Sequence, residues 1–159
     1  MARAKYPLEA LRTVRENAEK EATGELAEAV RAREAAEARA RAAEAERRRA
    51  EEEAEAKRLA EQAMLDAGEL RVADLRQADA WQLEVERQRR AHEARVAQAE
   101  VAREEATSAE DASRADLAQK SAERSVVDKD KERWEAKRRE AELAREEEAG
   151  AEAWRPKRV

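Results

Sequence analysis

Apolar and small side chains recur with a period of seven along most of the chain, which predicts two long helices. In the first half the repeating positions are Leu8, Ala22, Ala29, Ala36, Ala43 and Ala50. In the second half they are Ala78, Val85, His92, Ala99, Ala106, Ser113, Lys120, Val127, Trp134 and Ala141, with Trp81, Val96, Ala102 and Ala109 three or four residues away. Residues at this spacing stay on one helix face, so each half offers a seam to another helix.

Breaks in this pattern give the expected ends of the helices. Pro7 suits the first turn of a helix, where its missing N–H costs nothing. The next break is Asp66-Ala67-Gly68-Glu69, which combines a turn-favouring Asp with the residue that commonly follows a helix. We therefore expect one elongated domain over 1–159, with a helix at about 8–65, a turn at about 66–72, a helix at about 73–149 and a basic tail over 150–159.

If the chain reverses at this turn, the two helices pair antiparallel, and the residue opposite each position can be calculated. Residue i then faces roughly residue 137 − i, so Leu8, Leu11 and Val14 come close to Val126 and Val127. The predicted fold class is all-α, a long two-helix antiparallel coiled-coil hairpin with the second helix longer. About 20 residues at the end of the second helix lack a partner in this scheme. Trp134 and Trp154 lie beyond the predicted paired region, and we expect both to contact another protein.

Composition argues against a compact enzyme. Hydrophobic residues make up 42% of the 159, but 41 of them are Ala and only 25 are larger. A globular domain of this length buries roughly 70% of its unfolded surface, which so few large side chains cannot fill. The absence of Cys excludes disulfide and thiolate chemistry, and no apolar run is long enough to span a membrane. We expect a cytoplasmic, non-enzymatic protein without a cofactor.

Candidate chemistry along the chain is sparse. His92 is the only histidine and lacks further ligands at metal-site spacing, so we interpret it as a packed or partner-facing residue. The triplets Glu51-Glu52-Glu53 and Glu146-Glu147-Glu148 point in several directions on a helix and cannot converge on a substrate. Arg47-Arg48-Arg49 lies among glutamates, and the net charge is −5, so we expect ion pairs along the helix and no nucleic-acid binding.

Three stretches of the sequence resemble the FliJ/YscO family, the stalk proteins of flagellar and injectisome type III export machines. The opening KYPLEALRTVRENAEKEATGELAEA is similar to the family's start, with Tyr6, Leu8, Leu11, Val14 and Arg15 at its aromatic, hydrophobic and basic places. The region GELRVADLRQADAWQLEVERQRRAHEA resembles the start of the second helix. The stretch DKDKERWEAKRREAELAREEEAGAEAW resembles the charged, Trp-containing tail.

The resemblance implies a non-enzymatic stalk between a hexameric export ATPase and the cytoplasmic domain of an export-gate membrane protein. The implied ATPase contacts are Tyr6, Leu8, Leu11, Val126, Val127 and Trp134. The implied export-gate contacts are Trp81, Val85 and His92. The resemblance also allows export chaperones as partners, and we expect a monomer peripheral to the inner-membrane apparatus. The alternatives are a generic coiled-coil adaptor, a peripheral-stalk subunit of a rotary ATPase and a basic-tipped helix that binds nucleic acid.

Overall fold

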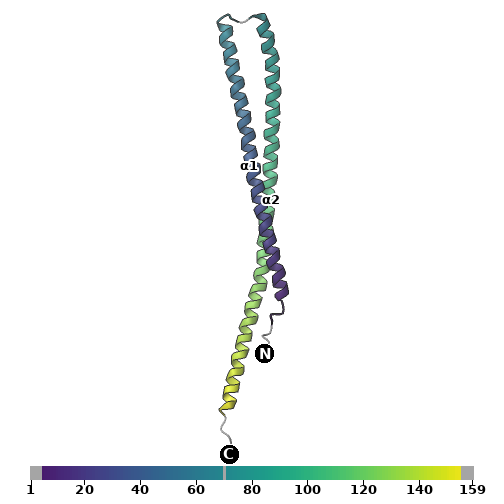
Figure 1. Cartoon of the computed structure of the whole chain (residues 1–159), viewed down its shortest axis with the longest axis vertical. Coiled ribbons are helices and arrows are strands. Elements are labelled where there is room, and N and C mark those ends of the chain that lie inside the picture. The colour runs from purple at the N-terminus through teal and green to yellow at the C-terminus, as the bar shows by residue number, and fades with distance from the viewer. Residues whose placement is uncertain (1–4, 70, 155–159) are drawn as a thin grey trace, which may run out of the picture. The chain divides into compact units, whose positions relative to one another are not determined.

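A computed structural model describes residues 5–69 and 71–154, and these residues form two long helices joined by a short connection (Figure 1). Helix α1 spans Glu9–Asp66 and helix α2 spans Val72–Ala153, with 58 and 82 residues. The described residues contain no strand. The predicted fold class is therefore confirmed, with the second helix the longer one. Helix α2 continues through Gly150 to Ala153, past the predicted end at about 149, while residues 155–159 of the predicted basic tail lie outside the described part.

The connection between the helices follows from local capping chemistry. Gly68 has a φ of 71°, and its N–H donates to the carbonyl of Leu65 at 3.0 Å. The N–H of Glu69 donates to the carbonyl of Met64 at 3.1 Å. These two bonds form a Schellman motif, which ends a helix at a glycine in the left-handed region. On the other side, Asp74 Oδ2 accepts the backbone N–H of Arg71 at 2.8 Å and so caps the start of α2.

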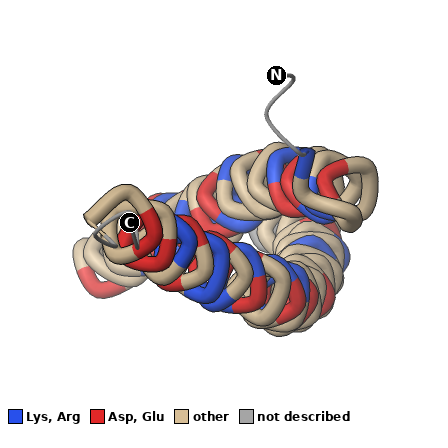
Figure 2. Tube along the Cα trace, turned by 90° about the horizontal axis from the view of Figure 1, so that it is seen from below, with Lys and Arg blue, Asp and Glu red and all other residues tan. Residues whose placement is uncertain are grey.

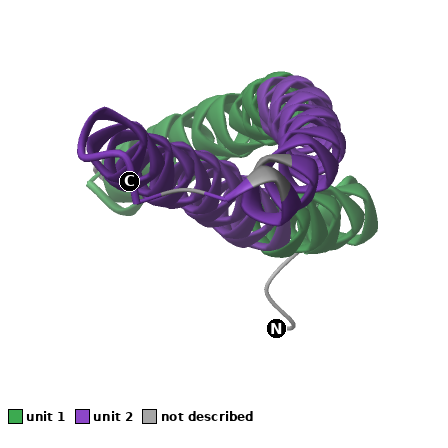
Figure 3. Cartoon of the chain, turned by 90° about the horizontal axis from the view of Figure 1, so that it is seen from above, with its two compact units in different colours: residues 1–26, 113–159 green, residues 27–112 purple. Residues whose placement is uncertain are grey.

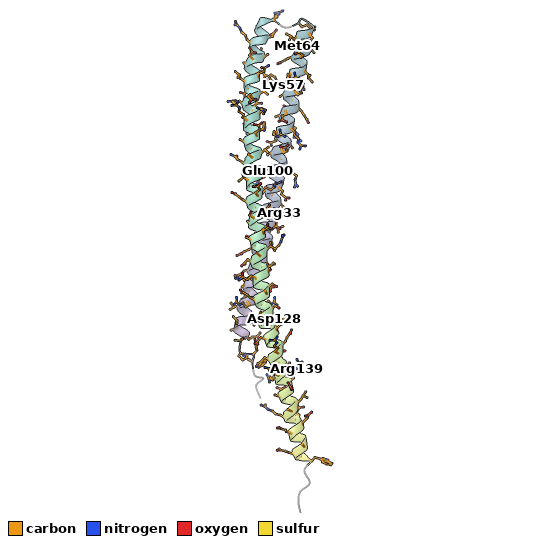
Figure 4. The ribbon with its side chains drawn as sticks, turned by 180° about the vertical axis from the view of Figure 1, so that it is seen from behind. Arg33, Lys57, Met64, Glu100, Asp128 and Arg139 are labelled. Carbon is orange, nitrogen blue, oxygen red and sulfur yellow. The ribbon has the colours of Figure 1, made fainter. Side chains whose placement is uncertain are left out.

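The chain divides into two compact units, and each contains a part of both helices (Figure 3). Unit 1 comprises residues 1–26 and 113–159, and unit 2 comprises residues 27–112. In unit 1 the side chain of Arg12 contacts Asp128, and in unit 2 the side chain of Arg33 contacts Glu110. The two segments within each unit therefore run antiparallel. Figure 4 labels Arg33 and Asp128 on their helices.

The interhelical contacts define the pairing register of both units. They join Tyr6 to Asp130, Glu9 to Lys131, Arg12 to Asp128, Arg15 to Glu123 and Glu19 to Arg124 in unit 1. In unit 2 they join Arg33 to Glu110, Glu46 to Arg95 and Lys57 to Trp81. The residue numbers of each pair add up to about 140, close to the value of 137 expected from the sequence. The antiparallel register was thus predicted to within about one helical turn.

The seam between the helices is built mainly from alanine. Ala22 and Ala36 are buried, and Ala29, Ala43 and Ala50 are half-buried, as the seven-residue period predicts. Leu8 and Ala141, the outermost predicted positions of the two phases, are exposed, and Ala40, which lies outside the predicted phase, is buried. The α2 phase from Ala78 to Trp134 is likewise half-buried throughout, except for Val127, which is fully buried. No described side chain is completely enclosed. Each alanine methyl buries little area, so the seam brings little hydrophobic stabilisation per layer.

One part of the predicted seam is wrong. Ala102 and Ala109 are exposed, whereas Glu110, Leu117 and Arg124 are buried or half-buried. From Glu110 to Arg138 the second column of α2 lies four residues after the first column, whereas Trp81 lies three residues after Ala78. This choice places charged side chains inside the seam, because the four-residue column carries Glu110 and Arg124. The sequence pattern allowed spacings of three and of four residues, and Ala102 and Ala109 were assigned to the seam because they are small and apolar.

Charged residues of both signs are interspersed with uncharged ones along both helices (Figure 2). Many form ion pairs along one helix, such as Arg47 Nη2 with Glu44 at 2.8 Å and Arg89 Nη2 with Glu86 at 2.8 Å. These arginines hold the pKa values of Glu44 and Glu86 at about 2, through hydrogen bonds to each carboxylate. Within the described residues, neither helix has a stretch that is long and apolar enough to cross a membrane.

Replacing Ala36 by Leu tests the close approach of the helices. The buried Ala36 side chain leaves no room for three more carbon atoms, so Ala36→Leu is expected to destabilise the protein by about 1–3 kcal/mol. Ala38→Leu is the matched control, because Ala38 lies two residues away on the exposed face of the same helix. Thermal unfolding followed by circular dichroism measures both. Equal melting temperatures for the two variants would contradict the seam.

Candidate interaction surfaces

The residues that the sequence assigned to an ATPase contact all lie in unit 1, but they fall into two groups. Tyr6 and Val127 are buried, and Trp134 is half-buried. Leu8, Leu11 and Val126 are exposed. The first group therefore holds the two helices together, and only the second group is accessible to another protein.

Tyr6 and Trp134 form an aromatic contact that joins the start of the chain to α2. The two ring centroids are 5.7 Å apart, and the rings meet edge to face at 61°. Arg138 lies over the Trp134 ring, with its Cζ atom 5.6 Å from the centroid. An aromatic pair of this geometry adds about 0.5–1.5 kcal/mol beyond the area that it buries.

The prediction that Trp134 lies beyond the paired region is therefore wrong. The sequence pairing counted partners only from Leu8 onwards, the first residue of the predicted helix. Tyr6 precedes α1 but still packs on α2, so that the paired region extends to Trp134. Trp154 does lie past the paired region, and 88% of its surface is exposed.

The Tyr6 hydroxyl is anchored by a carboxylate. It donates to Asp130 Oδ2 at 2.6 Å. This hydrogen bond, together with desolvation and the negative charge of Asp130, raises the pKa of Tyr6 to about 12. The phenol consequently keeps its proton, and the donor of this bond, over the whole physiological pH range.

Four ion pairs cross the seam next to this anchor. Their partners are Glu9 with Lys131 at 2.9 Å, Arg12 with Asp128 at 2.7 Å, Arg15 with Glu123, and Glu19 with Arg124 at 2.6 Å. A hydrogen bond from Arg12 lowers the pKa of Asp128, and one from Lys131 lowers the pKa of Glu9. Along α1 the charges run negative, positive, positive and negative, and α2 presents the opposite charge to each of them.

An exposed apolar surface accompanies these pairs, and we call it the terminal patch. It comprises Leu8, Leu11, Val14 and Val126. Val14 is 61% exposed and Val126 is 68% exposed. In an antiparallel pair the corresponding flanks of the two helices face the same side, and by their seam positions Leu11, Val14 and Val126 share that flank. Four large apolar side chains on an otherwise charged surface indicate a site of protein contact.

The residues assigned to an export-gate contact lie together in unit 2, in an interhelical hollow of about 510 Å³ that we call the turn-end cleft. Trp81, Val85 and His92 line it from α2, and all three are half-buried. Ala50 and Ala54 line it from α1, and their small side chains leave the space unfilled. The three predicted residues thus share one site, although they face the first helix rather than solvent.

Two features of the turn-end cleft were not predicted. Lys57, which interrupts the alanine repeat in the sequence, places its Nζ atom 5.7 Å from the centre of the Trp81 ring. Lys57 is exposed, so its charge stays in water while its ammonium group lies over the aromatic face. His92 Nδ1 is buried and has no hydrogen-bond partner. For His92, the sequence signal was its position in the same seam phase as Val85.

The described residues contain no group of three or more His, Cys, Asp or Glu side chains that could hold a metal ion. Their geometry defines a class of protein, a two-helix antiparallel coiled coil with an exposed terminal patch and a turn-end cleft. Comparison with protein-family models, with curated proteins and with solved structures finds no match to this chain.

Removing the Trp134 side chain tests its role in holding the helices together. Trp134→Ala is expected to lower the stability by roughly 1–2 kcal/mol, because the half-buried indole loses its contacts with Tyr6 and Arg138. Trp154→Ala is the control, since Trp154 is almost fully exposed. Chemical denaturation of both variants distinguishes them. A loss at Trp154 as large as that at Trp134 would contradict the packing described here.

Proposed function

We propose that this protein is a non-enzymatic stalk of a type III secretion export apparatus, of the flagellar or the injectisome kind. The observation that carries the proposal is the terminal patch, an accessible apolar surface at the start of α1, where α1 pairs with α2 in unit 1. The resemblance of the sequence to the FliJ/YscO family gives this surface a partner, the hexameric export ATPase. The export gate is the proposed partner of the turn-end cleft.

The exposure of each residue refines this proposal. Leu8, Leu11 and Val126 contact the ATPase directly, because they are the accessible members of the predicted set. Tyr6, Val127 and Trp134 act as positioning residues that keep these side chains on one firm surface. The mechanism is mechanical: an asymmetric coiled coil touches the subunits of a ring unequally and so biases their closure and hydrolysis.

The oligomeric state and location follow from the same reasoning. Each helix already uses its seam on the other helix of the chain, so the proposed state is a monomer, with one copy for each ATPase hexamer. The stalk works at the cytoplasmic face of the inner membrane, where the export ATPase and the gate meet. A role in escorting export chaperones rests on the sequence resemblance alone.

Hydrolysis of ATP by the export ATPase of the same organism tests the proposal. One equivalent of the protein per hexamer is expected to accelerate hydrolysis several-fold. The triple variant Leu8→Ser, Leu11→Ser and Val126→Ser is expected to lose this effect while keeping its helical signal, because the three side chains are exposed.

Leu83→Ser is the matched control, because Leu83 is 76% exposed on unit 2 and lies outside the terminal patch. It should stimulate hydrolysis as well as the unmodified protein does. If the unmodified protein neither binds nor stimulates the ATPase, the stalk proposal fails, and a coiled-coil adaptor takes its place.

A further inference from the structure

The charges that α2 presents to α1 in unit 1 repeat every seven residues. The basic residues are Arg124, Lys131 and Arg138, and the acidic pairs are Glu123 with Asp130 and Asp128 with Glu135. Residues Glu9, Arg12, Arg15 and Glu19 of α1 now meet Lys131, Asp128, Glu123 and Arg124. Seven residues further along α2 the same four residues would meet Arg138, Glu135, Asp130 and Lys131. Every pair would again join opposite charges.

The alanine seam does not oppose such a displacement. One seam column of α1, from Ala22 to Ala50, carries alanine in every heptad, so in that column a shift of seven residues puts alanine where alanine was. The other column is mixed and contains Leu26, Arg33, Ala40 and Arg47. Cores of large side chains select one register by shape, whereas methyl groups of equal size do not.

Helix α2 has enough unpaired length for the displacement, and the connection between the helices is long enough to allow it. All residues over 139–153 of α2 are exposed, so about 22 Å of helix is available beyond the present pairing. A shift of seven residues moves one helix along the other by about 10 Å. Residues 67–71 join the two helices. When extended, five residues reach about 17 Å, which is enough to absorb the movement without unwinding either helix.

Four contacts favour the observed register. A heptad shift would break the Tyr6–Asp130 hydrogen bond and the Lys57–Trp81 contact, and it would also break two further contacts. Tyr6 packs on Trp134 in unit 1, and a heptad shift would bring Ala141 to that level. Arg33 donates to the buried carboxylate of Glu110 at 2.5 Å in unit 2, and the shift would break this contact by putting Ala40 in the place that Arg33 now has relative to Glu110. The other interhelical ion pair of unit 2 would be replaced, because Arg95 would move from Glu46 to Glu53.

From these observations we infer that the two helices have a second pairing register, displaced by one heptad toward the C-terminal end of α2. The Tyr6–Trp134 and Arg33–Glu110 contacts make the observed register the more populated one. A displacement in the opposite direction is not equivalent, since Arg12 would face Ser121 and Glu19 would face Leu117. The inference holds whether or not the protein is an export stalk. In a stalk it would supply a movement of about 10 Å between the two helices.

Engineered disulfides can detect the second register, because the chain has no cysteine of its own. By the observed pairing Ala40 is level with Ala99, and after the proposed shift it would be level with Ala106. The pair Ala40→Cys with Ala99→Cys therefore reports the observed register, and Ala40→Cys with Ala106→Cys reports the second. Ala40→Cys with His92→Cys reports the opposite displacement and serves as the control. Disulfide formation in a glutathione redox buffer, read on a non-reducing gel, measures each population.

The expected result is nearly complete bridging to position 99, a minor fraction to position 106 and only background to position 92. Adding Arg33→Ala and Trp134→Ala should raise bridging to position 106 at least threefold and leave position 92 at background. The inference is overturned if positions 106 and 92 bridge equally in both backgrounds, because equal bridging indicates general loosening. Loss of bridging to position 99 would show that the double variant fails to fold. In that case the comparison is made without Arg33→Ala and Trp134→Ala: more bridging to position 106 than to position 92 supports the second register, and equal bridging overturns it.

Discussion

Charge pairs across the seam are the interaction on which this structure depends. Alanine lets the two helices approach closely, but it gives little stabilisation per layer and no preference for one register. Charged side chains in the seam columns help to distinguish registers: Arg33 and Glu110 pair only in the observed one, and Glu19 with Arg124 disfavours a shift toward the start of α2. The aromatic contact of Tyr6 with Trp134 adds to this preference. Ion pairs on an open surface contribute little, but those at seam positions lose part of their water and gain a fixed partner.

The same constraint explains where the candidate surfaces occur. The seam takes up few large apolar residues, such as Val127. The other large apolar residues of this region lie outside it, where they are exposed and form the terminal patch. In unit 2 the alanines of α1 are too small to fill the space opposite Val85 and His92, and the turn-end cleft results. Both surfaces therefore arise from an alanine-rich seam with large side chains placed at a few positions.

The sequence predicted the helices and their antiparallel pairing well, because helix periodicity and the Gly68 signal are local properties. It failed at Trp134 because Tyr6, which lies outside the periodic helix, makes the contact that extends the pairing. It also failed at Ala102 and Ala109, because apolar character was used to choose the seam column. Glu110 was missed for the same reason, since its burial depends on Arg33, a residue 77 positions away.

A double-mutant cycle on Arg33 and Glu110 tests the central claim most directly. The variants Arg33→Gln, Glu110→Gln and their combination are compared by chemical denaturation with the same cycle on Arg58 and Glu55, an exposed pair along α1. We expect a clear favourable coupling between Arg33 and Glu110 and almost none between Arg58 and Glu55. A coupling across the seam no larger than the one along the helix would contradict it.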